Sequence, residues 1–482
     1  MRRYREAALG LGDEFVTKYT SSVVVDEEIR EEVVQIMLAH VIHLIELGLI
    51  PIDPGRRLVS ALLELLEDPN RLRLENMIVE DVHEALEVLL GEKVREAAGY
   101  APLGRSRNDH VAAALRLRLA KRTLKLLRRV LSLRETLVRT SERFLDTPFP
   151  LHTHFQPAQI STYGHYLLAL EEELRDLSEL ALIDLKYVLR SPLGAAAGAG
   201  TSVPIERDAL ASSLGFEGVI DNTLYSTSSR GFVLRILHDL ASLAVLYSRV
   251  ATDFYLWSNP ALSLIELPSH HVQTSSIMPH KRNPASVEVM RARCIEVLVK
   301  PLLASMIEAK LPTGYSLDLQ EITKHVWEAF DLLEEATTVL EDLVGRAEPN
   351  RAAIEVYLRS FYCGLVEAAE LASMRLGLPF RELHAKIASL LRKHGWDCSK
   401  VLEALGSELG MELSGLADPV WVLSLRSSLG SPSPAALRDS LSRAREALSL
   451  HEMRAREFEK RLEESVEGLK RRARELARGS AS

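Results

Sequence analysis

Apolar residues recur at helical spacing over unusually long stretches of this chain, and this periodicity limits the folds that it can adopt. Between Phe232 and Trp257, apolar side chains cover most of the helix circumference and charges are sparse. Comparable stretches run through residues 110–144, 160–189 and 285–309, each far longer than the ~11–12 residues of an average helix. The sequence therefore predicts an all-α protein built around a long central helical bundle.

Proline and glycine clusters divide the 482-residue chain into three predicted helical domains. These are an N-terminal domain (1–105), a central long-helix bundle domain (106–345) and a C-terminal domain (346–482). Glu and Arg interleave from Arg438 to Arg478, which predicts solvated amphipathic helices rather than a partner-binding tail. Because the bundle helices are apolar around most of their surface, we expect several subunits to assemble into one larger bundle.

Composition argues against several classes of partner. The formal net charge of −8 gives no attraction to nucleic acid. Met1–Glu6 lead into a polar segment, and no run of 18 uncharged apolar residues follows, so we expect neither secretion nor a membrane. The three cysteines, Cys294, Cys363 and Cys398, are too widely spaced for a zinc motif, which predicts a reducing cytoplasm and no structural metal.

A short polar segment, residues 273–284, interrupts the helical pattern with hydroxyls, a cation and an amide. Its two prolines prevent a continuous helix, so backbone NH groups stay free to bind an anion. From the residues alone, a polar surface loop is an equally good interpretation. The segment resembles the GSSxMPxKxN signature of the aspartase/fumarase superfamily, whose members release fumarate from succinyl substrates. Thr274 replaces the usual glycine, and the motif positions are filled by Ser275, Ser276, Met278, Pro279, Lys281 and Asn283.

A second segment, Gly104–Asp109, precedes a predicted long helix. A helix N-terminus with hydroxyl, guanidinium and amide donors suits a carboxylate ligand. On residue type alone, simple capping by Ser106, Asn108 or Asp109 is the favoured interpretation. The segment resembles the GRSRND sequence that separates argininosuccinate lyases from their relatives, although His110 follows where that family commonly has glutamine.

Two further segments contain histidines. Residues 152–159 resemble the THxQxAQ stretch of the same family, which transfers its roles to Thr153, His154 and Gln156. Two histidines flanking a threonine before a helix-starting proline make a purely structural role less expected. Residues 80–83 resemble the family's EDxH, in which the histidine, here His83, lines the site. An ordinary polar helix face is the alternative interpretation of that stretch.

The resemblance implies acid/base chemistry without metal or organic cofactor. A weakly acidic proton leaves the succinyl Cβ, and negative charge develops on the adjacent carboxylate. Ser275 would be the base once neighbouring NH groups or cations stabilise its alkoxide, and Lys281 with Asn283 would stabilise the developing charge. His154 is either the alternative base or the acid that helps protonate the departing nitrogen.

The resemblance also implies which side chains bind the small-molecule substrate. Arg107, Asn108 and Thr153 would hold the succinyl carboxylates, while Tyr315, Gln320 and Lys324 would hold the arginine end. The complete set of predicted substrate-binding residues is Ser106, Arg107, Asn108, His83, Thr153, Gln156, Asn283, Tyr315, Gln320 and Lys324.

Some positions depart from the family pattern. The lysine expected three residues after the glutamine is replaced by Thr323, and Lys324 comes one residue later. Tyr225, Ser229 and Gly231 stand where acidic residues are usual. These departures concern substrate choice rather than reaction type.

The resemblance therefore implies a cytoplasmic lyase that splits argininosuccinate into arginine and fumarate, assembled as a homotetramer. Its active sites would draw the Arg107, His154 and Ser275 regions from different subunits. Two other functions stay open. One is adenylosuccinate lyase or another fumarate-releasing relative, favoured by the Lys281–Pro284 ending. The other is an inactive structural relative, as lens crystallins of this family are.

Overall fold

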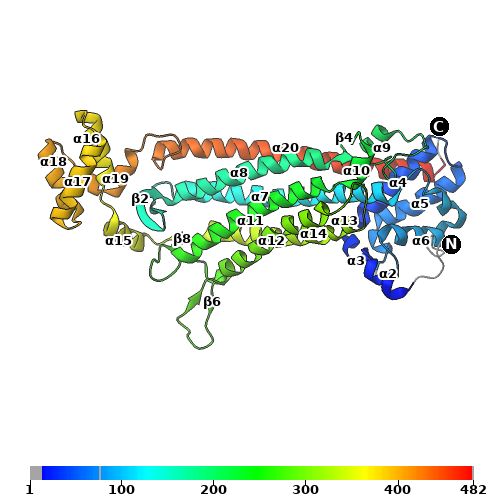
Figure 1. The fold of residues 1–482 in the computed structure, drawn as a ribbon, viewed down its shortest axis with the longest axis horizontal. Coiled ribbons are helices and arrows are strands. Elements are labelled where there is room, and N and C mark those ends of the chain that lie inside the picture. The colour runs from blue at the N-terminus through cyan, green and yellow to red at the C-terminus, as the bar shows by residue number, and fades with distance from the viewer. Residues whose placement is uncertain (1–12, 75–76, 480–482) are drawn as a thin grey trace.

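The computed structural model describes residues 13–74 and 77–479, which form an elongated, mostly helical molecule (Figure 1). The predicted polar start, Met1–Glu6, lies outside the described residues. Long helices lie side by side along the longest axis, as the periodicity predicts. They are α7 (Arg107–Arg143), α8 (Tyr163–Val188), α11 (Gly231–Trp257), α12 (Ala285–Ala309) and α14 (Thr323–Arg346). The all-α prediction is confirmed.

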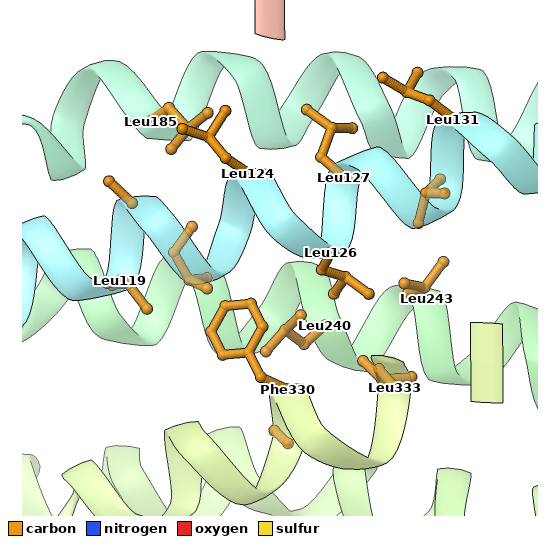
Figure 2. Packing of buried hydrophobic residues seen from close by; sticks show 14 of the residues in the cluster. Leu119, Leu124, Leu126, Leu127, Leu131, Leu185, Leu240, Leu243, Phe330 and Leu333 are labelled. Carbon is orange, nitrogen blue, oxygen red and sulfur yellow. The ribbon is translucent and has the colours of Figure 1, made fainter. Parts of the chain in front are cut away.

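Leucine side chains fill the interior of this bundle (Figure 2). On α7, Leu124, Leu127 and Leu131 point towards α8, whereas Leu126 points towards α11 and α14. Phe330 on α14 closes the same layer and is fully buried. Each such side chain contributes roughly 1.5–3 kcal/mol when removed from water, so this core holds α7 straight between its two ends.

One end of the bundle, where α7 begins, is covered by the N-terminal helices; we call it the proximal end. The helix α4 is buried on nearly all sides because it is apolar around its circumference. The elements here are α2 (Glu14–Thr20), α3 (Val23–Asp26), η1 (Glu27–Ile29), α4 (Arg30–Glu46), α5 (Ile52–Glu67), η2 (Pro69–Arg71), α6 (Val82–Val94) and η3 (Arg95–Tyr100).

The opposite, distal end has a small helical lobe (Figure 1). From this lobe, the 44-residue helix α20 returns along α7 and α8 to the N-terminal helices. It is one amphipathic helix whose apolar side, including Leu448 and Phe458, is buried. The elements are α15 (Arg351–Phe361), α16 (Leu365–Leu376), α17 (Phe380–His394), α18 (Cys398–Leu409), η5 (Ser414–Ala417), α19 (Pro419–Ser424) and α20 (Pro434–Ala477).

A disulfide joins Cys363 and Cys398 inside the distal lobe, with Cα atoms 5.0 Å apart. The third cysteine, Cys294, is a buried free thiol. The spacing of the cysteines did not reveal this pair, because two helices lie between them in sequence and the fold brings the two ends of that segment together. The inference of a reducing environment from spacing alone therefore has no support here.

Short strands make four two-stranded sheets in the described residues. Pro157 was expected to start a helix, but it lies in the longest hairpin; α8 begins only at Tyr163, where the Thr162 hydroxyl accepts the NH of His165. Pairs are β1 (Pro148–Thr153) with β2 (Gln156–Thr162), β3 (Arg190–Ser191) with β4 (Gly218–Val219), β5 (Ile265–Glu266) with β8 (Glu348–Pro349), and β6 (Gln273–Thr274) with β7 (Arg282–Asn283). Shorter helices are α9 (Arg207–Ser213), α10 (Thr223–Ser228), η4 (Ser269–His271) and α13 (Asp318–Glu321).

Among the described residues, only α11 is long and apolar enough to cross a membrane. Half of its most apolar window is buried, and it packs against α8, α12 and α14. A core helix of a bundle meets the same criteria, so α11 alone is weak evidence for a membrane. The predicted domain edges near 105 and 345 fall at the start of α7 and the end of α14. The three-domain division remains a prediction.

Candidate active site

The first turn of α7 sits at the proximal end. The Ser106 hydroxyl caps this helix by accepting the NH of Asn108 at 3.3 Å, and Asp109 accepts the NH of Ser106 at 3.0 Å. Gly104 precedes it with φ of 75°, where an added Cβ would lie 2.9 Å from Val203. The capping interpretation is therefore confirmed for Ser106. A contact between Ser106 and substrate remains a prediction.

Asp109 also holds the glycine- and alanine-rich connection beside the helix. Its Oδ2 accepts the NH groups of Gly194 at 3.2 Å and Ala196 at 2.9 Å. Burial raises the pKa of Asp109 to about 6, although these NH groups oppose the rise. The Asn108 amide donates to the carbonyl of Ala197 at 3.4 Å. The connection thus has a structural role and positions Asn108.

Arg107 lies between two acidic side chains. Its Nη1 is 2.9 Å from Glu80 and 3.0 Å from Asp81, and Asp81 is almost fully buried. Arg107 itself keeps about a quarter of its side chain exposed. A guanidinium held by fixed carboxylates needs little reorganisation to bind another anion.

Three buried histidines lie behind this turn. The ring of His110 is 5.4 Å from that of His40 and 6.3 Å from that of His83, centroid to centroid. Burial lowers the pKa of His83 to about 4 and that of His110 well below its ordinary value. His83 is only 2% exposed, so it supports the wall of the site; its predicted contact with substrate is not tested.

Of the predicted arginine-binding residues, Tyr315 precedes α13 and Gln320 lies on it, and this helix packs at the same end (Figure 1). Lys324 lies on α14. Burial raises the pKa of the Tyr315 hydroxyl, and the charges of Arg107 and Arg230 oppose the rise. Gln320 is 8% exposed. Lys324 is exposed and pairs with Glu321 at 2.7 Å, because α14 begins at the preceding residue and turns this side chain outward.

The position expected to hold lysine is the buried Thr323, the first residue of α14. In the other departing segment, Arg230 is 1% exposed and donates to the carbonyls of Thr227 and Ser229 at 3.3 and 3.2 Å. The Ser229 hydroxyl accepts the NH of Gly231. The start of α11 therefore lacks acidic side chains at the three positions where the family usually has them, and Glu308 of α12 accepts the NH of Arg230 at 2.8 Å instead.

Sequence analysis did not single out Ser22 and Asp26, a hydrogen-bonded pair that lies beside the Asp81 segment. The Ser22 hydroxyl donates to Asp26 at 2.7 Å, and the NH of Val82 points at the same carboxylate at 3.5 Å. Burial, with Asp81 nearby, raises the pKa of Asp26 to about 7. The signal available in the sequence was weak: a Ser-Ser pair before an apolar run resembles an ordinary helix start.

His154 lies at the distal end, at the tip of the β1–β2 hairpin. His154 and Phe155 form a two-residue turn with φ of 53° and 58°, the sign that a hairpin of this length requires. Thr153 and Gln156 face each other across the last pair of the ladder. All of these side chains are exposed, so the hairpin presents them to whatever covers this end.

Ser275 also lies at the distal end, in a loop closed by β6 and β7 (Figure 1). Its hydroxyl oxygen accepts the NH groups of Ile277 at 3.3 Å and Met278 at 3.2 Å. Two NH donors aimed at a serine oxygen stabilise negative charge there. Lys281 is exposed and Asn283 half-buried, and both close the same loop.

The predicted site residues thus fall into two groups at opposite ends of one chain. Between them runs α7, whose 37 residues span roughly 55 Å at 1.5 Å per residue. Within one chain, the Arg107 group does not meet the His154 and Ser275 groups.

Comparison with known proteins identifies this arrangement. A sequence profile described as Lyase matches residues 9–299. The argininosuccinate lyase of Pyrococcus furiosus is 37% identical over 458 residues, which cover 94% of this chain and 97% of that protein. The argininosuccinate lyase of Pyrobaculum arsenaticum is 40% identical over 448 residues, or 92% of this chain and 98% of that protein.

Solved structures agree on the fold. An EDDS lyase in complex with formate has a TM-score of 0.84 at 24% identity, covering 99% of this chain and 96% of its own. A class II fumarase from Schistosoma mansoni has a TM-score of 0.70 at 19% identity, covering 85% of this chain and 94% of its own. The fold is therefore that of the fumarase-type helical lyases, and the chain is a lyase. Within this class, it belongs to the argininosuccinate lyase family.

Proposed function

We propose that this protein reversibly eliminates fumarate from argininosuccinate to give arginine, a step of arginine biosynthesis in the cytoplasm. The observation that supports this most directly is the Ser275 oxygen held by two backbone NH groups in a loop of the lyase type. Family membership over most of the chain supports the substrate.

In this mechanism Ser275 takes the proton from the succinyl Cβ. The NH groups of Ile277 and Met278 lower the cost of its alkoxide. Lys281 and Asn283 stabilise the charge that develops on the neighbouring carboxylate. His154 then protonates the departing guanidino nitrogen, directly or through water. All of these roles are filled by side chains and backbone NH groups of the protein, so we propose that the reaction needs no cofactor.

The test is to follow fumarate absorbance after mixing the purified protein with argininosuccinate or with adenylosuccinate. We expect argininosuccinate alone to be turned over. Replacing Ser275 with alanine should lower the rate by about 10²–10⁴, the usual contribution of a positioned base. Ser276→Ala, one residue along in the same loop, is the matched control and should keep most of the rate.

Either alternative function gives a different result. Turnover of adenylosuccinate alone would replace the proposed substrate with its rival. Absence of fumarate from every substrate, with no effect of Ser275→Ala, would indicate an inactive crystallin-like relative.

We further propose a homotetramer with active sites shared between subunits. The helix α12 exposes a continuous apolar stripe at three- and four-residue spacing, which would otherwise face water. Its members are Ile295, Val299, Leu302, Leu303 and Met306. Burying this stripe against other subunits would also bring the distal end of one chain to the proximal end of another. Light scattering on the eluting protein should give four chains per particle, and a monomer with full activity would contradict the proposal.

A further inference from the structure

Two histidines and an aspartate meet at the base of the Ser275 loop. His270 and His271 belong to η4, which leads directly into β6, and Asp342 lies on α14. Their ligand atoms all lie within 4.8 Å of one another. The Nε2 atoms of His270 and His271 are 2.5 and 2.9 Å from the same oxygen, Oδ2 of Asp342. None of these residues has a role in the proposed elimination.

The rings are held so that both Nε2 atoms face this oxygen. The Ser286 hydroxyl, in the first turn of α12, lies 2.8 Å from Nδ1 of His271 and fixes that ring. Arg346 donates to the other oxygen, Oδ1 of Asp342, at 2.6 Å and so leaves Oδ2 directed at the histidines. Hydrogen bonds of this kind behind a histidine or carboxylate orient metal ligands in proteins.

The donor set determines which ions fit. Two imidazole nitrogens and one carboxylate oxygen suit Zn²⁺ and similar divalent transition metals, whereas Mg²⁺ and Ca²⁺ prefer oxygen alone. Around an ion with bonds of about 2.0–2.1 Å, neighbouring ligands lie roughly 3 Å apart. The two Nε2 atoms lie at 2.5 and 2.9 Å from Oδ2 of Asp342, and all three atoms lie within 4.8 Å of one another. The His271 side chain is 5% exposed and that of His270 is 57% exposed. The cluster is therefore buried on the side of His271 and accessible to solvent on the side of His270.

We propose that His270, His271 and Asp342 bind one divalent transition metal ion of the Zn²⁺ class, which ties the base of the Ser275 loop to α14. The ion replaces the two histidine–aspartate hydrogen bonds with bonds to a common centre. Water completes its coordination on the side of His270. Its position behind β6 and β7 makes it a structural clamp on the loop rather than a reacting group.

The test is metal binding itself, which does not depend on the proposed reaction. Protein freed of metal with a chelator is titrated with Co²⁺, whose visible absorption reports bound nitrogen and oxygen ligands, and then with Zn²⁺ as a competitor. We expect one ion per chain, displacement of Co²⁺ by Zn²⁺, and a higher unfolding temperature with Zn²⁺. Mg²⁺ should not compete.

Substitutions of the proposed ligands test which side chains bind the ion. Asp342→Asn and His271→Ala should abolish the absorption, and Ser286→Ala should weaken binding by about 10–100-fold, the usual effect of a residue behind a ligand. His238→Ala, an exposed histidine on α11, is the matched control and should bind as before. Absence of Co²⁺ binding, or binding that survives Asp342→Asn, would overturn the proposal.

A consequence for catalysis follows only if the proposed elimination is correct. The metal-free protein should then eliminate fumarate more slowly, and Zn²⁺ should restore the rate in the native sequence but not in Asp342→Asn. Unchanged turnover with intact metal binding would leave the clamp a purely structural one. It would still be established by the titration.

Discussion

The two ends of the bundle are built in opposite ways. At the proximal end Arg107 lies against Asp81 and Glu80, and buried histidines support it from behind. At the distal end His154 and Ser275 lie on projecting hairpins whose side chains are largely exposed. One end is thus organised by its own chain. The other presents reactive groups that the proximal end of the same chain cannot reach, because the 37 residues of α7 keep the two ends apart.

The largest expected effect comes from mixing two inactive variants, which tests whether one active site combines the two ends from different chains. Ser275→Ala changes only the distal end and Arg107→Ala only the proximal end, so each should abolish most activity alone. If sites combine both ends from different chains, unfolding and refolding the two together should restore a measurable fraction of the rate, since some sites then receive two intact halves.

The control for this experiment is a mixture of two variants that are both changed in the same loop. Mixing Ser275→Ala with Lys281→Ala should restore nothing, because both changes lie in the same loop and no site then receives an intact loop. Recovery in that mixture, or none in the first, would contradict the proposal that active sites are shared between chains.

The disulfide of the distal lobe should have the next largest effect. It closes a segment of 35 residues, and a closure of that length contributes on the order of 4 kcal/mol by the chain-entropy argument. Cys363→Ala should therefore lower the stability of the lobe, as measured by hydrogen exchange on α16–α18. A reducing agent should reproduce this loss in the native sequence and add nothing in the variant. If reduction changes neither protein, the pair contributes nothing to stability.

The sequence predicted the long helices of the bundle but not the distal hairpin or the contacts between distant segments. The long helices and the fold class followed from periodicity, and α12 matches its predicted range, residues 285–309. The hairpin at His154 did not, because the sequence contains neither Asn-Gly nor another usual turn pair there, and Pro157 resembled a helix start. The pairing of Cys363 with Cys398 and the meeting of His271 with Asp342 arise from tertiary contacts between distant segments, which local patterns do not record.

The proximal end should make stability depend on pH. The pKa of Asp26 is raised to about 7, so the folded state holds its proton more tightly than the unfolded chain does. The stabilisation is therefore full below the unfolded pKa and is lost as pH rises through about 7. Between pH 5 and 8 the native protein should lose roughly 2 kcal/mol from this group.

Asp26→Asn isolates that contribution in denaturant titrations. Its amide oxygen can still accept from Ser22 and Val82, but it does not titrate, so the variant should lose less stability across this range. Equal pH dependence in both proteins would mean that Asp26 stays ionised in the folded state. Its burial would then be compensated by the hydrogen bonds from Ser22 and Val82 and by the charge of Arg107.

The smallest expected effect concerns the turn that carries His154. Phe155 has φ of 58°, a conformation that costs a residue with a Cβ about 1 kcal/mol and costs glycine nothing. Phe155→Gly should therefore be as stable as the native protein or more stable by up to about 1 kcal/mol, whereas Phe155→Ala keeps the strain and should gain nothing. Thermal unfolding of the assembled protein measures both. The Phe155 ring is 66% exposed in one chain, so its removal costs little there. If both variants instead lose stability equally, the ring must pack on a neighbouring subunit, and the distal end would be completed by its partner through this side chain as well.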